Sequence, residues 1–301
     1  MKNAAIFSCK GMGDGLLALV LSNNLALNGV ETTTFHPFLQ GVQEWFPHLP
    51  IRPFPAIEDL KRFDHFFIIY EKTPWMEAVL AFCETNYPEQ THVLNPIATR
   101  NRDYPYWEVG RFDGGLSFVD NLQRYCQNEL KLSQTVRENG IAPPPSLQPQ
   151  AYSKRVIIHP TSSREGKNWS KESYLALHDK LNEKGYDPVF ILTQEEKRSW
   201  TEVDAPQFSR LSDLAAFVCE SGYMIGNDSG IGHLASCLGL PTLTICRSRG
   251  AAEFWRPAWA PGALVFPPLW IPNLKGLRWR DRYWKSWISP ERVLREFKKF
   301  V

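Results

Sequence analysis

The sequence predicts an α/β fold made of two doubly wound halves, each built on a parallel sheet. Three observations predict it. Apolar strand-like runs alternate with helical patterns through both halves of the chain, which is typical of βαβ units. A proline-rich segment without periodicity, from Pro143 to Gln150, separates the halves as a linker would. The chain has 301 residues, enough for two domains of about 150 residues each.

The elements before the linker alternate in type. Strands are expected at 4–9, 32–36, 66–70 and 91–94, and helices at 16–27, 39–46, 75–85 and 117–132. Strands joined by helices of this length run parallel. Ligands of such sheets bind beyond the carboxyl ends of the strands, so the loops that follow the strands are the places to search for function.

A second series of elements follows the linker, beginning with a strand at 155–159. Ser170 is a candidate N-cap of the next helix, whose apolar face includes Tyr174, Leu177 and Leu181. Further strands are expected at 188–192, 223–225 and 242–246, with helices from 195, at 213–219 and at 231–238.

A last helix is predicted to begin at Ser289 and Pro290, which are favoured at an N-cap and in a first turn. Its apolar face predicts that it docks on another element and consists of Val293, Leu294, Phe297 and Val301. We therefore expect two domains, 1–150 and 151–285, and a C-terminal helix, 286–301.

Composition excludes several classes of protein. The formal net charge is only +2, and nine of the Lys/Arg residues, against three acids, lie in 275–301. This is not the overall signature of a nucleic-acid binder. The six cysteines are scattered, so we expect free thiols in a reducing compartment. The N-terminus lacks a signal-peptide pattern, and the longest helical apolar run, 16–21, is too short to span a bilayer, so we expect a cytoplasmic protein.

The most informative motif is the run Gly226-Asn-Asp-Ser-Gly-Ile-Gly-His-Leu-Ala235, which follows a strand and precedes a helix. Ser229 and Gly230 leave backbone N–H groups exposed at a helix N-terminus, which is a seat for a phosphate. A phosphate would repel Asp228, so this carboxylate is expected to accept hydrogen bonds from neutral hydroxyls or N–H groups. Together they suggest a sugar-nucleotide site.

A glycine-rich turn, Lys10-Gly-Met-Gly-Asp-Gly15, follows the first strand. Its glycines run on a period of two, so it is neither the dinucleotide fingerprint nor a P-loop. Asp14 is either a general base that projects from the turn into a cleft between the domains or the cap of a helix that starts near Gly15.

Two loops of the second half carry further candidates. Thr161, Ser162 and Lys167 lie near a helix start, where hydroxyls and a cation can bind a diphosphate, although an ordinary solvated loop has the same composition. Glu195 and Glu196 follow the next strand and either hold ribose hydroxyls or stabilise the start of a helix.

His233 lies in the first turn after the phosphate seat and is either a structural residue or part of the site. The sequence has no His/Cys/Asp/Glu cluster with zinc-ligand spacing, so no metal and no cofactor are expected.

Together these loops resemble glycosyltransferase family 9, whose best-known members are the bacterial lipopolysaccharide heptosyltransferases. The matching pieces occur in the family's order: Gly13-Asp14, Pro160-Thr-Ser162 with Lys167-x-Trp169, Glu195/Glu196, Asp228-Ser-Gly-x-x-His-Leu-Ala235 with Gly239-x-Pro241, and Ile288-Ser-Pro-Glu-x-Val293. The resemblance implies a GT-B architecture: two Rossmann-like domains that face a central cleft, with the last helix crossing back to the first domain. It also implies inverting, metal-independent transfer from ADP-heptose to a lipopolysaccharide core or a similar glycan acceptor.

Transferred residue by residue, the resemblance makes Asp14 the general base and Lys167 a catalytic cation. The donor would be held by Gly13, Thr161, Ser162, Glu195, Glu196, Asp228, Ser229, Gly230 and His233. Departure of a nucleoside diphosphate develops negative charge, which a lysine and a helix N-terminus can stabilise in place of a metal.

The acceptor side carries no family pattern in this sequence. Basic candidates for a phosphorylated or carboxylated acceptor are Lys10, Arg100, Arg102 and Arg111. Six of the eleven tryptophans lie between Trp255 and Trp287 among prolines and basic residues. They either contact a lipid-linked acceptor at the cytoplasmic face of the inner membrane or pack between domains.

Two other functions are consistent with this fold. A sugar-nucleotide epimerase or hydrolase would need further acids or histidines around the donor sugar, and the sequence has no matching set. A non-catalytic nucleotide-sugar-binding protein would have no evident need for an acid at Asp14.

Overall fold

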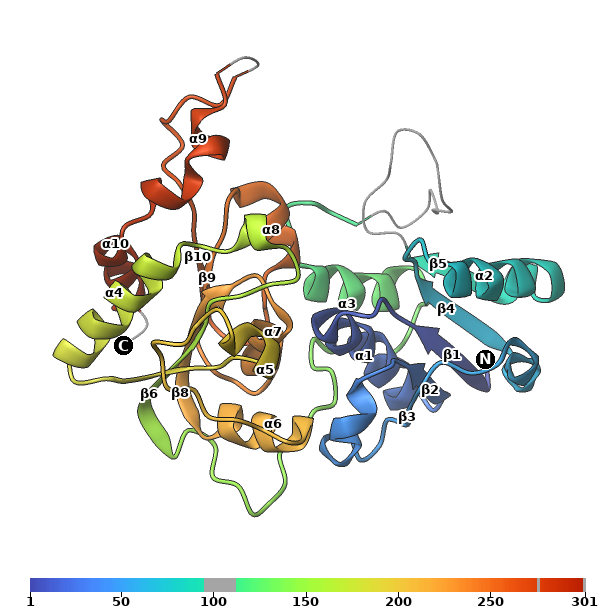
Figure 1. Cartoon of the computed structure of the whole chain (residues 1–301). Coiled ribbons are helices and arrows are strands. Elements are labelled where there is room, and N and C mark those ends of the chain that lie inside the picture. The colour runs from blue at the N-terminus through green and yellow to red at the C-terminus, as the bar shows by residue number, and fades with distance from the viewer. Residues whose placement is uncertain (95–111, 275–276, 300–301) are drawn as a thin grey trace. The chain divides into compact units, whose positions relative to one another are not determined.

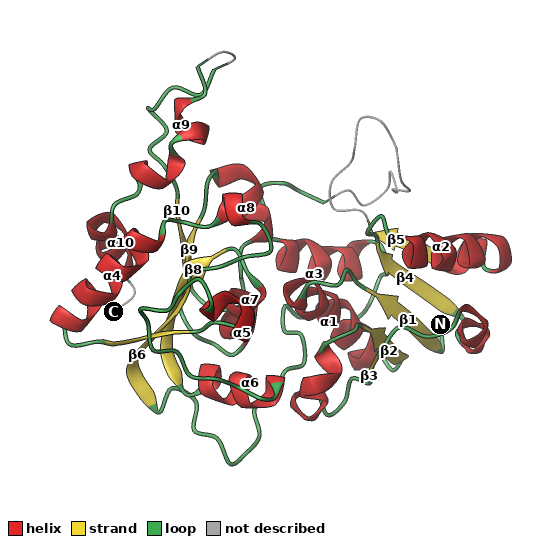
Figure 2. Ribbon diagram, in the orientation of Figure 1, coloured by secondary structure: helices red, strands yellow, loops and turns green. Residues whose placement is uncertain are grey.

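The computed structural model describes residues 1–94, 112–274 and 277–299. It divides into two compact units, Met1–Pro144 and Pro145–Val301. Each unit contains one parallel β-sheet with helices packed around it (Figures 1 and 2). No helix of the described chain is both long and apolar enough to cross a bilayer.

The sheet of unit 1 has the strand order β3-β2-β1-β4-β5, and all of its pairs are parallel. The strands are β1 (Asn3–Phe7), β2 (Glu31–Phe35), β3 (Ile51–Arg52), β4 (His65–Ile69) and β5 (Thr91–Leu94). The helices are α1 (Met12–Leu27), α2 (Pro74–Asn86) and α3 (Phe118–Asn128), with 3₁₀ segments η1 (Leu39–Trp45), η2 (Ile57–Arg62) and η3 (Pro88–Gln90).

Both faces of this sheet are covered. Ala5 and Phe7 of β1 belong to a buried cluster that includes Met76 and Val79 of α2. Ala4 and Ile6 are equally buried, and the alternation of side chains along a strand puts them on the opposite face. This arrangement explains why the strands read as unbroken apolar runs in the sequence.

The sheet of unit 2 has the order β10-β9-β8-β6-β7, again with parallel pairs only. Its strands are β6 (Tyr152–His159), β7 (Asp187–Phe190), β8 (Ser221–Asn227), β9 (Thr242–Ile245) and β10 (Gly262–Val265). The helices are α4 (Lys171–Glu183), α5 (Gln194–Lys197), α6 (Leu211–Cys219), α7 (Gly230–Cys237), α8 (Arg249–Trp255), α9 (Trp279–Arg282) and α10 (Pro290–Phe297), with η4 (Glu165–Lys167) and η5 (Trp284–Trp287).

The C-terminal helix α10 differs from the expected arrangement, in which it crosses back to the first domain. Val293, Leu294 and Phe297 are buried in the core of unit 2, and α10 packs against α4, β9 and β10 of its own unit. Lys180 of α4 lies 2.9 Å from Glu291 of α10. The helix therefore finds the apolar partner that its amphipathic pattern requires next to the strands that precede it.

Three other local expectations also need correction. The segment expected as a helix at 39–46 is a 3₁₀ segment with a kink at Val42, and the helix expected to reach 132 ends at Asn128. The edge strands β3 and β10 were not predicted, and β3 has only two residues, too few to show a period of two.

The order of the strands reverses once in each sheet. In unit 1 the reversal lies between β1 and β4, and in unit 2 it lies between β6 and β8. At such a point the connections leave in opposite directions and open a crevice at the carboxyl ends of the two strands. The loops at these two crevices hold most of the candidate residues.

Candidate functional site

The crevice of unit 2 is organised by Asn227, the last residue of β8. Its side chain is 2% exposed, donates a hydrogen bond to the carbonyl of Pro160 and accepts one from the backbone N–H of Trp169 at 3.1 Å. One amide therefore fixes both ends of the loop 160–169. The sequence analysis did not single out Asn227, although a polar residue at the end of an apolar strand is a signal for such a role.

Lys167 and Asp228 meet across this crevice. The Lys167 ammonium donates a hydrogen bond to Asp228 Oδ2 at 3.3 Å. The two side chains are 48% and 30% exposed, so water screens the pair and both groups remain accessible to a ligand. The structure thus brings together two residues that the sequence separates, and it places a cation beside the N-terminus of α7.

The N-terminus of α7 contains two buried polar atoms that have no hydrogen-bond partner within the described residues. They are Ser229 Oγ and His233 Nδ1. Ser229 is the N-cap residue, yet its hydroxyl makes no capping bond. Burial lowers the pKa of His233, although Asp228 opposes the shift, so the ring is neutral at pH 7. Unpartnered buried polar atoms are costly, and a ligand that pairs with them recovers that cost.

The helix start at Gly230 follows a close contact between strands. A side chain at Gly226 would collide with the carbonyl oxygen of His159 on β6, so glycine lets β8 approach β6 at the crevice. His159 Nδ1 in turn lies 2.9 Å from the carbonyl of Ile191 and donates to it. The floor of the crevice is therefore rigid, since it is fixed by backbone packing and buried hydrogen bonds.

Thr161 and Glu196 are brought together, but they bond to each other. The Thr161 hydroxyl donates to Glu196 Oε1 at 2.5 Å, and Glu196 Oε2 accepts from the backbone N–H of Thr193 at 2.7 Å as part of a capping box on α5. Burial would raise the pKa of Glu196, but hydrogen bonds from Thr161 and Thr193 and the charge of His159 outweigh it and lower the pKa. Glu196 is therefore a carboxylate that orients the Thr161 side chain.

Ser162 and Glu195 are placed differently from Thr161. The Ser162 hydroxyl donates to Asn168 Oδ1 at 2.7 Å, which closes the loop on itself. Glu195 lies exposed in the first turn of α5. Of the two adjacent acids, Glu196 is the one that bonds to the loop 160–169.

The crevice of unit 1 is a short turn from β1 into α1. The helix begins at Met12 with Gly11 as N-cap, so Asp14 is the third helical residue and not the N-cap. The Asp14 side chain is half-buried and folds back over Gly11. Its Oδ2 atom lies so close that a side chain at position 11 would collide with it. Lys10 is exposed, and its backbone N–H donates to Glu71 at 3.3 Å.

His36 fixes this turn and was missed in the sequence. Its Nδ1 accepts hydrogen bonds from the backbone N–H groups of Phe38 and Leu39 at 3.1 Å, so the proton lies on Nε2, which donates to the carbonyl of Gly11 at 3.0 Å. Burial lowers the pKa of His36, which keeps the ring in this neutral form. A side chain at Gly15 would lie 2.5 Å from the His36 ring, so glycine is required there.

The carboxylate of Asp14 affects its neighbour Cys9. Burial raises the pKa of the Cys9 thiol, and the charges of Asp14 and Glu71 raise it further. Cys9 is therefore a protonated thiol and not a nucleophile. All six cysteines are described, and none forms a disulfide.

The acceptor-side arginines Arg100, Arg102 and Arg111 lie outside the described residues. Within the described residues no group of three or more His, Cys, Asp or Glu side chains is arranged to hold a metal ion.

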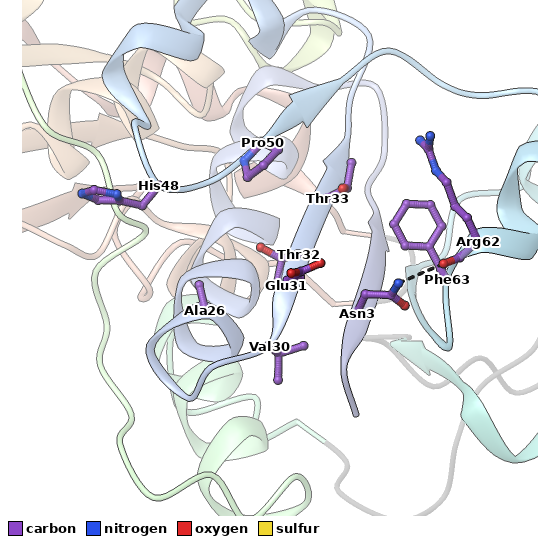
Figure 3. A pocket seen from close by; sticks show the side chains of 10 residues that line it. All are labelled: Asn3, Ala26, Val30, Glu31, Thr32, Thr33, His48, Pro50, Arg62 and Phe63. Atoms are coloured by element: carbon purple, nitrogen blue, oxygen red, sulfur yellow. Dashed lines mark hydrogen bonds between the residues drawn. The ribbon is translucent and has the colours of Figure 1, made fainter.

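A cavity of about 500 Å³ in unit 1 lies away from these crevices. Figure 3 shows the side chains that line it, of which Asn3 and Glu31 lie at the amino ends of β1 and β2. It is lined by Asn3, Ala26, Val30, Glu31, Thr32, Thr33, His48, Pro50, Arg62 and Phe63. Asn3 uses its amide to bond the carbonyl of Arg62, so this cavity presents no convergent set of groups for chemistry.

A comparison with protein families matches the part of the chain that holds the crevice of unit 2. Residues 119–263 match the model of glycosyltransferase family 9 (heptosyltransferase), a region that includes Lys167, Asp228 and the start of α7. No curated protein sequence matches the chain significantly.

Several solved structures share the fold. E. coli heptosyltransferase WaaC with ADP is 14% identical, with a TM-score of 0.66 over 99% of this chain and 100% of that one. A family 9 glycosyltransferase from Veillonella parvula is 16% identical, with a TM-score of 0.70 over 99% and 96% of the two chains. The iron-containing dodecameric glycosyltransferase TibC from E. coli is 14% identical, with a TM-score of 0.58 over 99% of this chain and 76% of that one.

The family match, the motifs that it contains and the two Rossmann-like sheets agree with one another. Residues 119–263 therefore match glycosyltransferase family 9, and the chain has the two-sheet GT-B fold of the heptosyltransferase structures.

Proposed function

We propose that this enzyme transfers a heptose, with inversion, from ADP-heptose to a lipid-linked saccharide acceptor of the lipopolysaccharide-core type. The observation that carries the proposal is the set of polar and cationic side chains at the crevice of unit 2. There the N-terminus of α7, the unpartnered Ser229 Oγ and His233 Nδ1, and the Lys167 cation lie together. Such a group suits the diphosphate of a sugar nucleotide.

The reaction needs two kinds of help. The acceptor oxygen attacks the anomeric carbon, the bond from that carbon to the diphosphate oxygen breaks, and the acceptor proton moves to a base. Asp14 is the proposed base, and its place in the first turn of α1, folded over Gly11, presents a carboxylate at a loop edge. The leaving diphosphate gains negative charge, which Lys167 and the α7 dipole stabilise.

The remaining roles follow the same division. Thr161 and Ser162 line the diphosphate side, Glu195 or Glu196 contacts the nucleoside, and Asp228 accepts hydrogen bonds from sugar hydroxyls. Gly13 and Gly230 provide backbone approach, while acceptor binding is assigned to Lys10, Arg100, Arg102 and Arg111. The paired Lys167 and Asp228 imply a specific step: when the donor binds, their mutual hydrogen bond is replaced by one that Lys167 donates to a phosphate oxygen and one that a sugar hydroxyl donates to Asp228.

We further propose that transfer needs neither a metal nor a cofactor, and that it takes place at the cytoplasmic face of the inner membrane, where a lipid-linked acceptor would be met. TibC carries iron according to its description, so metal content is a property to be measured. Addition of a chelator to purified enzyme should leave turnover unchanged, and metal analysis should find less than one equivalent per chain.

Thermal-shift titration with ADP, UDP and GDP tests the donor class. ADP should raise the unfolding temperature most, because a ligand that binds only the folded state stabilises it. Incubation with ADP-heptose and a heptose-deficient core saccharide should then release ADP and yield a heptosylated product, identified by mass spectrometry. If none of the three nucleotides raised the unfolding temperature, the proposal would fail. If ADP bound but the reaction released only free heptose, the enzyme would be a hydrolase.

A further inference from the structure

A segment of unit 2 between β10 and α10 extends away from the sheet. Figure 1 shows it, with α9, projecting beyond the helices that cover the strands. We call the described residues 269–274 and 277–287 the aromatic–basic arm. The family motifs assign it no role, and it contains none of the residues of the crevices described above.

The arm exposes an unusual amount of apolar surface. Among the described residues, its large hydrophobic side chains that are more than a third exposed are Leu269, Trp270, Leu274, Leu277, Trp279, Tyr283 and Trp287. Trp270 is 78% exposed and Leu274 is 72% exposed. The rest of the described chain contributes only Met1, Leu27, Phe38 and Tyr152 to this class. Contiguous apolar exposure of this kind marks an interaction surface.

The arm is folded, so its exposure does not reflect an unstructured chain. Ile271, Trp284 and Ile288 at its base are buried, and the Trp169 indole donates to the carbonyls of Lys285 and Ile288 at 3.1 Å. Arg280 donates to the carbonyl of Leu269 at 3.1 Å, which ties the two limbs of the arm together. The exposed rings are therefore held outward by a fixed base.

The charges on the arm have one sign at its surface. Its described residues include four Lys/Arg residues and a single acid, Asp281. The Asp281 side chain is only 14% exposed and pairs with Arg278 at 2.6 Å and Arg247 at 3.5 Å. Arg278 and Arg282 are exposed. The surface around the exposed tryptophans is therefore cationic.

We propose that the aromatic–basic arm docks this enzyme on a bilayer that contains anionic lipids. Tryptophan and leucine side chains enter the interfacial layer, where amphipathic rings are favoured, while Arg and Lys remain at the level of the phosphates. Each basic residue adds attraction to an anionic leaflet. A second copy of the same arm is a poor partner, because a symmetric contact brings like charges together.

The purpose of this docking, bringing the enzyme to a lipid-linked acceptor, rests on the proposed function. Binding of the arm to lipid is a property of its own residues. Vesicle binding and nucleotide binding are separate measurements, so either proposal can fail while the other holds.

Flotation of the full-length chain with vesicles tests the docking. Vesicles of phosphatidylcholine with about 30% phosphatidylglycerol should carry the protein upward and shift its tryptophan emission to the blue, and high salt should weaken both effects. Vesicles of phosphatidylcholine alone should bind at least about tenfold less.

Variants locate the contact. The double substitution Trp270→Ser with Leu274→Ser should weaken binding about tenfold or more, because two large side chains no longer leave water. Arg282→Glu should weaken binding to anionic vesicles to a similar extent. Tyr152→Ser and Lys154→Glu, at the exposed amino end of β6, are matched controls that should bind as the wild type does.

Two results would overturn the proposal. One is failure of the wild-type chain to float with anionic vesicles. The other is equal binding by the arm variants and the controls, with unfolding temperatures that show all of them folded. Loss of a dimer in the arm variants without any vesicle binding would assign the arm to self-association instead.

Discussion

The two crevices use opposite kinds of loop. In unit 1 the chain passes from β1 to α1 through the short turn Ser8–Gly11, whereas in unit 2 the loop Pro160–Ser170 separates β6 from α4. The short turn is fixed by His36 and holds one carboxylate, while the long loop is fixed by Asn227 and presents hydroxyls and a lysine. A base must be held in one place, and a donor must be enclosed from several sides. The difference therefore matches a division of labour between base and donor site.

Strand order supports this comparison. Unit 1 has its reversal beside its first strand in the order 3-2-1-4-5, and unit 2 has it beside β6 in the other common doubly wound order. The two sheets thus have different strand orders, yet in each the candidate residues lie at the carboxyl ends of the strands where the order reverses. Variants at the two crevices test the assignment of the base to unit 1 and of the donor to unit 2.

The largest effect is expected for Asp14→Asn. An amide cannot accept the acceptor's proton, so kcat should fall by about 10²- to 10⁴-fold. The dissociation constant for ADP should stay within about twofold, because the assigned donor contacts other than Gly13 lie in unit 2. The control is Glu71→Gln, which keeps an oxygen for the Lys10 N–H and should retain turnover. If kcat fell equally in both variants, the loss would come from a disturbed turn and not from the missing base.

Lys167→Ala should weaken ADP binding by about 10- to 100-fold, the range expected for a charge-assisted hydrogen bond. It should also lower kcat, because the leaving diphosphate loses a cation. Lys171→Ala is a matched control, since that lysine pairs with Glu202 at 2.6 Å and donates to the carbonyl of Ser199. Titration calorimetry of the two variants measures the difference, and unchanged affinity in Lys167→Ala would remove the lysine from the donor site.

Gly15→Ala should destabilise unit 1 by about 1–3 kcal/mol, the usual cost of overpacking. The new methyl group would lie 2.5 Å from His36 and 2.6 Å from Leu39. Gly166→Ala in the loop of unit 2 should be nearly neutral, because no atom lies within 4 Å of the added carbon. Urea denaturation of both variants compares the tight turn with the open loop, and equal stability would contradict the proposed difference in rigidity.

His92 makes the stability of unit 1 depend on pH. Burial, with a smaller contribution from His65, lowers the pKa of His92 to about 4. The unfolded chain takes up a proton near pH 6.5 that the folded chain refuses until about pH 4, so stability falls as the pH drops through this window. His92→Gln should remove up to about 1.4 kcal/mol per pH unit of this slope. His48→Gln, at an exposed position, should leave the slope of the denaturation midpoint against pH unchanged.

Ser229→Ala and Thr161→Val give the smallest effects and separate two kinds of hydroxyl in unit 2. Removal of the Ser229 hydroxyl, which has no partner in the described chain, should leave the nucleotide-free stability unchanged and weaken ADP binding by about 2- to 10-fold. Thr161→Val breaks the bond to Glu196 and should cost about 1 kcal/mol of stability. Thermal unfolding with and without ADP measures both, and a stability loss in Ser229→Ala would assign that hydroxyl to the fold.

Local signals in the sequence predicted most of the fold. Buried parallel strands are continuous apolar runs, so β1, β4 and β9 were found near their true positions. The caps predicted at Ser170 and Ser289 are confirmed, since each accepts a bond at 3.3 Å from the backbone three residues ahead. Strands and helix caps of this kind are determined by residues that are close together in the chain, so they can be predicted from the sequence.

Non-local features could not be predicted in the same way. The apolar face of α10 shows that it docks, but its partner α4 is more than a hundred residues away in the chain. His36 and Asn227 act through backbone groups of distant loops, and no local pattern marks those partners. The pairing of Lys167 with Asp228 likewise follows from the reversal of strand order between β6 and β8.

Hydrogen–deuterium exchange of the full-length chain with and without ADP tests the division of labour most directly. We predict that ADP slows exchange in 160–170 and at the start of α7, where backbone N–H groups receive the diphosphate. The turn from Lys10 to Gly15, where Gly13 is the single residue assigned to the donor, should be protected far less. Protection of that turn, with none at 160–170 or α7, would contradict the assignment of the donor to unit 2.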